Sequence, residues 1–202
     1  MTDENRVELM QRLELMETMV AEGRKITERA GWIFVLWGVA YFAAVGWEIF
    51  LPAKNFAWPV CIAAAIVILN VGKARQKAKS GSGESPRSRS SESVWRGVGI
   101  AITLYVIGAV VSHHITQPAC TAAILFFVGL AHAISAMILR WKAQGVAAAI
   151  WWIGGSATFF TGPRAGVVIF LAAAFFGMIV FGLYAMMLER KREISGSVVA
   201  SS

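Results

Sequence analysis

The residue best placed to do chemistry is His132, in the middle of a long apolar stretch. Ser135 follows three residues later, so both side chains share one face of a helix. Ionisable groups inside a membrane-spanning segment are costly and are candidate functional groups by default. A proton or substrate role is one interpretation of His132. The more ordinary one is a neutral imidazole in a contact between helices, because no carboxylate accompanies it within the span.

A second group of ionisable residues is expected at the outer ends of the spans. Glu48 lies near the end of the first apolar stretch, and His113 and His114 near the end of the third. A carboxylate close to imidazoles could titrate at about pH 5–7 and bias a helix arrangement. Ordinary solvation of each group at the interface is the alternative. The two histidines point about 100° apart on a helix, which does not suit a shared metal ion.

The chain contains none of the motifs that would indicate an enzyme. H-E-x-x-H, a P-loop, a Gly-x-Ser-x-Gly elbow and a dinucleotide fingerprint are all missing. We therefore expect no catalytic residues, no cofactor and no metal. Cys61 and Cys120 match no zinc pattern. Their equivalent places near two outer helix ends leave a disulfide conceivable, and two separate packed thiols are the alternative.

Six apolar stretches carry these residues, and charged connectors separate them. A hydrocarbon core of ~30 Å needs about 20 apolar residues of helix, with about 17–25 tolerated. The composition also indicates a membrane protein, because the chain is 57% hydrophobic and only 15% charged, whereas soluble domains carry more charge. We predict an all-α integral membrane bundle of six transmembrane helices over residues 30–192, embedded in a lipid bilayer. The stretches are 32–51, 56–72, 97–113, 119–139, 146–161 and 165–188.

The positive charges indicate how the chain crosses the membrane. Of 19 Lys and Arg, five precede the first stretch, seven lie between the second and third, two follow the fourth and three follow the sixth. Only Lys54 and Arg164 remain for the other side, and cytoplasmic connectors are the basic ones. Both termini are therefore expected in the cytoplasm, in a bacterial-type inner (plasma) membrane. This distribution explains the net charge of +7 without nucleic acid, which we do not expect as a partner.

The first 29 residues are expected to form a cytoplasmic amphipathic helix, and they are too charged to be a cleavable signal peptide. Leu9, Leu13, Met16 and Val20 recur at spacings of four, three and four, which places them on one helical face. Gly23 is expected to interrupt this helix. One interpretation is a helix lying on the membrane or the bundle. The other is self-association, or docking of a cytosolic partner, through residues 3–22.

Two segments are predicted to be irregular. The second span should continue as a basic helix to about residue 79 and then give way to a Ser/Gly/Arg-rich linker, so that residues 73–93 form one basic cytoplasmic loop. Such a composition buries little apolar surface, and the tail over 193–202 is expected to be disordered for the same reason.

Prolines suggest a repeated hairpin. Four of the five prolines lie at the three outward turns, namely Pro52, Pro59, Pro118 and Pro163. Each even-numbered stretch starts near one of them and ends in a basic cluster, which predicts three helical hairpins of one orientation. The alternative is that outer turns simply favour proline.

This pattern resembles the HdeD-like acid-resistance membrane proteins over roughly residues 30–192. The likeness rests on the outer prolines, on Trp-led odd helices at Trp32 and Trp141, and on basic ends of the even helices. It implies a small inner-membrane protein linked to stress. We therefore expect a non-enzymatic membrane protein in stress response or signalling. The alternative is a small transporter or channel that uses a polar site within the bundle.

Overall fold

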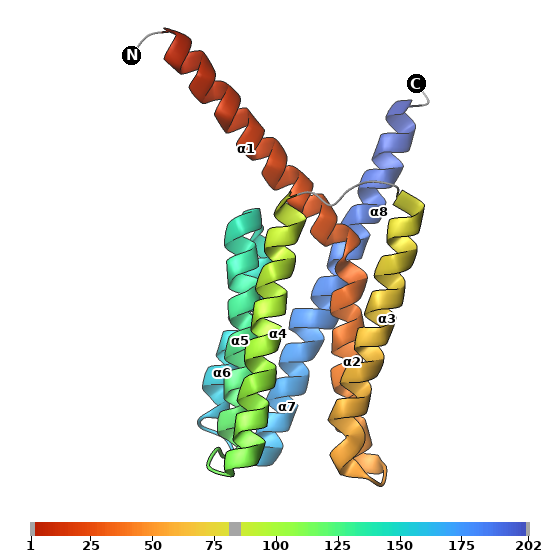
Figure 1. The fold of residues 1–202 in the computed structure, drawn as a ribbon, viewed down its shortest axis with the longest axis vertical. Coiled ribbons are helices and arrows are strands. Elements are labelled where there is room, and N and C mark those ends of the chain that lie inside the picture. The colour runs from red at the N-terminus through yellow and green to blue at the C-terminus, as the bar shows by residue number, and fades with distance from the viewer. Residues whose placement is uncertain (1–2, 81–85, 201–202) are drawn as a thin grey trace.

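The computed structural model describes residues 3–80 and 86–200, and every regular element in these ranges is helical (Figure 1). The all-α prediction is confirmed for this part of the chain. The elements are α1 (Asp3–Arg29), α2 (Gly31–Phe50), the 3₁₀ turn η1 (Lys54–Phe56), α3 (Ala57–Ser80), α4 (Pro86–Ser112), α5 (Gln117–Leu139), α6 (Lys142–Thr158), α7 (Pro163–Ala174), the π-helical segment η2 (Phe175–Val180) and α8 (Phe181–Ala200).

Large apolar side chains are exposed along the outside of the helices. Examples are Ile100, Val111, Val168 and Phe160, the last with 89% of its surface exposed. Soluble monomers do not present an apolar surface of this extent to water. Five helical segments are long and apolar enough to cross a membrane: 31–50, 57–75, 92–112, 117–139 and 163–192. The last is α7, η2 and α8 in one continuous run, and α6, with 17 residues, is not among the five.

The helices run roughly side by side and are joined by short turns (Figure 1). Neighbours in the chain pack together as α2 with α3, α4 with α5 and α6 with α7, and the most extensive contact joins α5 and α6. The turns that carry Lys54 and Arg164 lie at one end of the bundle. Both chain termini lie beyond the other end, where α1 extends obliquely away from the bundle (Figure 1).

The core lies around α5, where α2, α6 and the run from α7 to α8 converge. Leu125, Leu139 and Trp151 are completely buried there, and Met178 of η2 is nearly so. In contrast, the backbone of α3 lies close only to α2 and η1 among the described elements, and its further contacts, such as the Trp58 ring against Phe170 of α7, are made by side chains. Most of its outward residues are exposed, as expected for a helix that faces lipid.

Glycine permits the closest helix contact, where α2 begins beside α8. A Cβ built on Gly182 would lie 2.6 Å from the carbonyl oxygen of Gly31 and 3.0 Å from the backbone nitrogen of Val35. These are backbone atoms, so no side-chain rotation can make room. Small residues let helices approach this closely in hydrocarbon, where apolar burial alone does not hold them together.

The predicted interruption of the N-terminal helix at Gly23 is wrong. Helix α1 runs unbroken from residue 3 to 29, and the Thr27 hydroxyl donates to the Gly23 carbonyl oxygen at 3.1 Å. Gly23 is buried where α1 reaches the bundle. Packing against the bundle therefore outweighs the roughly 1 kcal/mol by which glycine disfavours a helix.

Part of each segment predicted to be irregular is helical. Pro86 starts α4, so residues 86–93 are helical and do not belong to the linker, since proline suits the first turn of a helix. Residues 81–85 of that linker lie outside the described residues. In the tail, α8 continues to Ala200, and no proline interrupts it. Only residues 201–202 of the predicted disordered tail lie outside the described residues.

The glycine contact between α2 and α8 yields a direct stability test. Gly182→Ala should destabilise the protein by about 1–3 kcal/mol, because the new methyl group meets backbone that cannot move aside. Thermal unfolding in detergent measures the effect. The matched control is Gly108→Ala on α4, where nothing lies within 4 Å of the added Cβ. That control should be neutral or stabilising, and equal losses in both variants would contradict the assignment.

Candidate functional site

Four helices bring an aromatic cage around His132. Its imidazole lies 4.9 Å from the Trp95 ring of α4, 5.5 Å from Phe34 of α2 and 5.5 Å from Phe181 of α8, measured between ring centroids. The Phe34 ring is stacked on the imidazole, whereas the other two meet it edge to face. Phe34 also contacts both other rings. The sequence placed His132 in mid-span, but the cage requires residues from four separate helices.

The polar atoms of this region are buried without partners. His132 and Ser135 have no exposed surface, and neither the two ring nitrogens nor the Ser135 hydroxyl has a hydrogen-bond partner in the described part of the chain. The side-chain amide of Gln144 at the start of α6 is buried in the same way. A buried polar group without a partner costs about 1–3 kcal/mol, so each of them calls for an explanation. The surrounding aromatic rings could stabilise a protonated His132 by cation–π attraction. They could equally pack against the neutral imidazole.

The predicted group at the outer end does not assemble into a site. Glu48 on α2, His113 and His114 are all exposed. Among the described residues, no hydrogen bond or ion pair joins the Glu48 carboxylate to either imidazole, and the backbones of α2 and α4 do not approach each other closely. The two turns belong to different helix pairs. Ordinary solvation of each group is therefore the better interpretation.

The two cysteines are also separate. Cys61 on α3 and Cys120 on α5 are free thiols, each half-buried. Their helices share no contact in the described ranges, so the structure contains no bridge between them. No group of three or more potential metal ligands gathers among the described residues either.

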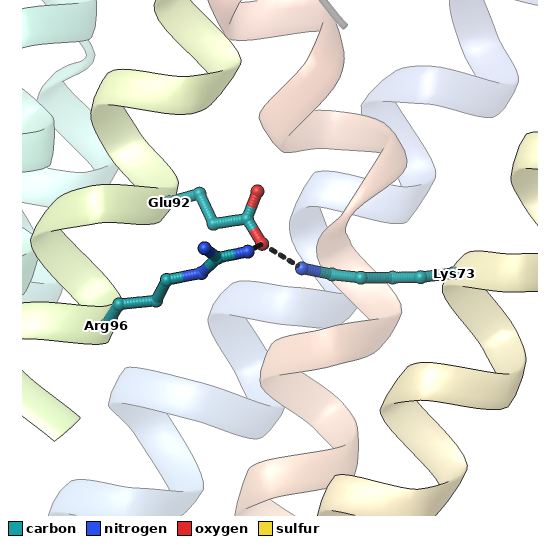
Figure 2. Close-up of polar contacts among 3 residues, drawn as sticks. All are labelled: Lys73, Glu92 and Arg96. Atoms are coloured by element: carbon teal, nitrogen blue, oxygen red, sulfur yellow. Dashed lines mark hydrogen bonds and ion pairs between the residues drawn. The ribbon is translucent and has the colours of Figure 1, made fainter. Parts of the chain in front are cut away.

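The end of the bundle that bears the termini contains ion pairs that the sequence analysis overlooked. In Figure 2, Lys73 extends from α3 to the Glu92 carboxylate of α4. The Lys73 ammonium lies 2.6 Å from one Glu92 oxygen, and the Arg96 guanidinium lies 2.9 Å from the same oxygen. Because the backbones of α3 and α4 do not approach each other closely, this cluster links two helix pairs by side chains alone.

Helix α1 is anchored at the same end. The buried Glu28 carboxylate lies 3.0 Å from the Arg192 guanidinium of α8, and Arg29 lies 3.4 Å from Glu189 on that helix. Arg24 donates to the carbonyl oxygen of Arg140 at 2.8 Å, in the turn between α5 and α6. The base of α1 is thus attached to two separate parts of the bundle.

The sequence analysis did not predict these ion pairs, because it considered acidic residues only within the apolar stretches. Glu28, Glu92 and Glu189 lie just outside those stretches, in the basic connectors. A signal was present, since an acidic residue in an otherwise basic interfacial segment needs a cationic partner when it is buried. Which cation pairs with each one depends on the helix arrangement.

Comparison with known proteins adds no assignment: no family model, no curated protein and no solved structure matches this chain. The resemblance to the HdeD-like proteins therefore stays a prediction from the sequence pattern.

Glu28 predicts a specific pH dependence. Burial raises the pKa of Glu28 above its ordinary 4.5, and the Arg192 guanidinium opposes that rise. A carboxyl with a raised folded-state pKa stabilises the fold most below its unfolded pKa, and this contribution is lost as the pH rises through the folded-state pKa. The protein should therefore lose stability above about pH 4.5, and Glu28→Gln should remove this part of the loss. Thermal unfolding in detergent over about pH 4–8 measures it.

The matched control for this prediction is Glu48→Gln, which removes an exposed carboxylate at the opposite end of the bundle. It should leave the pH dependence of the parent protein unchanged. An identical pH profile for the parent and the Glu28→Gln variant would show that Glu28 does not couple stability to pH.

Proposed function

We propose that this chain is a non-enzymatic membrane protein of six transmembrane helices in a stress-response or signalling system. In this proposal its N-terminal helix transmits the state of the bundle to a second copy of the chain. The observation that carries it is the arrangement of α1: its base is fixed to α8 through the buried Glu28, whereas Leu9 and Leu13 in its outer half are exposed. An unbroken helix between these two parts can pass on a change in the bundle.

The six-span topology rests on α6 and on the charge distribution. With 17 residues, α6 is about 25 Å long, at the lower limit for crossing the hydrocarbon core. Seventeen of the 19 Lys and Arg fall outside the two turns with Lys54 and Arg164. Positive charge marks the cytoplasmic side, which supports cytoplasmic termini in a bacterial-type inner membrane. Packing of α2 with α3, α4 with α5 and α6 with α7 supports three hairpins.

The stress-related role is supported by the resemblance to the HdeD-like acid-resistance proteins. The buried Glu28 adds a physical reason, because its ionisation would alter the joint between α1 and α8 as the pH changes. The joint and the exposed leucines lie on one helix, so acid could change how α1 is presented to a partner.

A second copy of the chain suits the outer half of α1 better than a membrane surface does. Residues 3–17 carry five acidic and two basic side chains. Helices that lie on anionic membranes are usually rich in Lys and Arg, so this half would be repelled. The spacing of Leu9, Leu13, Met16 and Val20 is that of the a and d positions of a coiled coil.

Charge complementarity favours a parallel pair of α1 helices. With Leu13 and Val20 at a positions, and Leu9 and Met16 at d positions, Arg12 falls at g and Glu17 at the following e position. In a parallel two-stranded coiled coil these positions face each other across the seam, so Arg12 of each chain would meet Glu17 of the other. Because the pair of helices is two-fold symmetric, the dimer contains two such ion pairs. Two heptads give a weak interface, which suits a regulated contact better than a permanent one.

The second candidate function is a small transporter or channel. It is favoured by the unpartnered polar atoms of His132, Ser135 and Gln144, which lie in the bundle interior. Intramembrane polar groups commonly mark a substrate or proton pathway. His132 is the residue on which this alternative depends.

Reversing one charge of the α1 pair tests self-association. Arg12→Glu should weaken dimerisation several-fold, because it places two acidic residues opposite each other, and Arg12→Glu combined with Glu17→Arg should restore it. Energy transfer between labelled copies of the full-length protein in nanodiscs measures association. Failure of the double variant to recover would contradict a parallel seam.

A leucine pair provides the matched control for this seam. Leu13 and Leu15 are both exposed, but a rotation of about 200° along the helix places them on nearly opposite faces. Only Leu13 lies on the proposed seam. Leu13→Glu should abolish the energy transfer, whereas Leu15→Glu should leave it unchanged. Equal effects of the two substitutions would point to nonspecific contact.

The transport alternative predicts that His132→Leu abolishes proton flux into proteoliposomes driven by a potassium diffusion potential. The same substitution should keep or raise the melting temperature, because it removes polar atoms that have no partner. His114→Leu, at an exposed outer position, is the control. Equal flux in the parent and the His132→Leu variant would remove this residue from any pathway.

A further inference from the structure

A pocket of about 310 Å³ lies where the base of α1 meets the α5–α6 turn and α8. Its lining residues are Arg24, Arg140, Trp141, Lys142, Ala143 and Tyr184. Three of the six are cationic and none is acidic. Glu28, one turn from Arg24 on α1, pairs with Arg192 and also interacts with the charge of Arg24, but it does not line the pocket. The pocket therefore carries a concentrated positive charge.

Hydrogen-bond donors are available in this pocket. Arg24 uses one terminal nitrogen on the Arg140 carbonyl oxygen, and its Nε is buried with no partner among the described residues. The start of α6 adds the backbone N–H groups of Lys142 and Ala143, which have no intrahelical acceptor at the first turn. No side chain caps this helix start.

This combination is typical of a phosphate site. The uncapped start of a helix presents N–H groups and a partial positive charge, which favour phosphate and similar anions. Arginine contributes charged donors in a fork that matches phosphate oxygens. Here the helix start and the cationic residues Arg24, Arg140 and Lys142 line one pocket.

The position of the pocket favours a lipid as the source of the phosphate. Trp141 and Tyr184 line it, and such residues gather at the membrane–water interface. One helical turn from Lys142 and Tyr184 towards the middle of the bundle, Val146 and Val180 expose apolar surface along which acyl chains can lie. Basic pockets between helices on the cytoplasmic side bind anionic headgroups in this way.

We propose that this pocket binds the phosphate group of an anionic phospholipid. The bound headgroup bridges α1 and the α5–α6 turn, because Arg24 comes from the former and Arg140 and Lys142 from the latter. The inference is independent of self-association, since it involves the base of α1 and not the exposed leucines of its outer half.

Native mass spectrometry of the full-length protein in neutral detergent tests this site. Phosphatidylglycerol should bind about tenfold more tightly than phosphatidylcholine with the same acyl chains. The double variant Arg140→Gln with Lys142→Gln should lose most of that preference, because each cation near the surface strengthens anionic lipid binding several-fold. Lys142→Gln alone should show a smaller loss, and it serves as the readout if the double variant does not fold.

The matched control is Arg75→Gln with Arg190→Gln, which removes two exposed cations from the same end of the bundle. It should keep the preference within about twofold, since neither residue lines the pocket. If the control and pocket variants lost the preference for phosphatidylglycerol equally, general charge attraction would explain the binding, and the proposal would be overturned. Inorganic phosphate is the separate arm: displacement of the lipid by phosphate at similar concentration would assign the pocket to free phosphate and overturn the lipid proposal.

Discussion

The exposed apolar surface of this protein, with five helices long and apolar enough to cross a membrane, suits hydrocarbon as the surrounding solvent. Large apolar side chains cover the outside of the helices, so hiding them from water cannot be what draws the helices together. In lipid, association relies on close packing and on polar contacts between helices. The residues buried at the helix contacts are accordingly small, as with Ala44, Ala122, Ala174 and Ala185, which are completely covered. Gly31 and Gly182 bring two backbones into direct contact.

The same solvent explains how polar groups are distributed. At the end that bears the termini, carboxylates find cationic partners, as Glu92 does with Lys73 and Glu28 with Arg192. In the middle of the bundle, His132 has only aromatic rings around it. Polar contacts thus tie helices together where charge is tolerated, while the interior is held by packing. The exception is the unpartnered group of polar atoms around His132, which gives the transport alternative its support.

The charged end also connects elements that are far apart in the sequence. The base of α1 contacts α8 and the α5–α6 turn, and Lys73 links α3 to α4. If α1 signals to a second copy, as proposed, any change in these contacts alters the direction in which its leucines are presented. A lipid phosphate bound between Arg24 and Lys142 would act at the same joint, and would make the joint sensitive to membrane composition.

Much of this architecture could be predicted from local patterns. Apolar runs of the length of a bilayer predict helices, and these are confirmed for five segments, because length and hydropathy are properties of consecutive residues. The proline positions likewise indicated where helices begin, as at Pro118 and Pro163. Local reasoning was wrong at Gly23 and over 86–93, where a glycine and a polar composition suggested breaks. At Gly23, packing of α1 against the bundle keeps the helix intact, and at Pro86 the proline starts a helix earlier than the polar composition suggested.

The sequence by itself determined that this is a helical chain suited to a membrane, since each stretch must satisfy its own backbone hydrogen bonds in hydrocarbon. Only the tertiary structure decided which side chains meet. The cage around His132 draws on four helices, the partner of Glu28 lies 164 positions further along the chain, and Glu48 and His113 stay apart. Such contacts depend on the rotation and order of the helices. Those are set by interlocking small residues across interfaces, which no single stretch of sequence encodes.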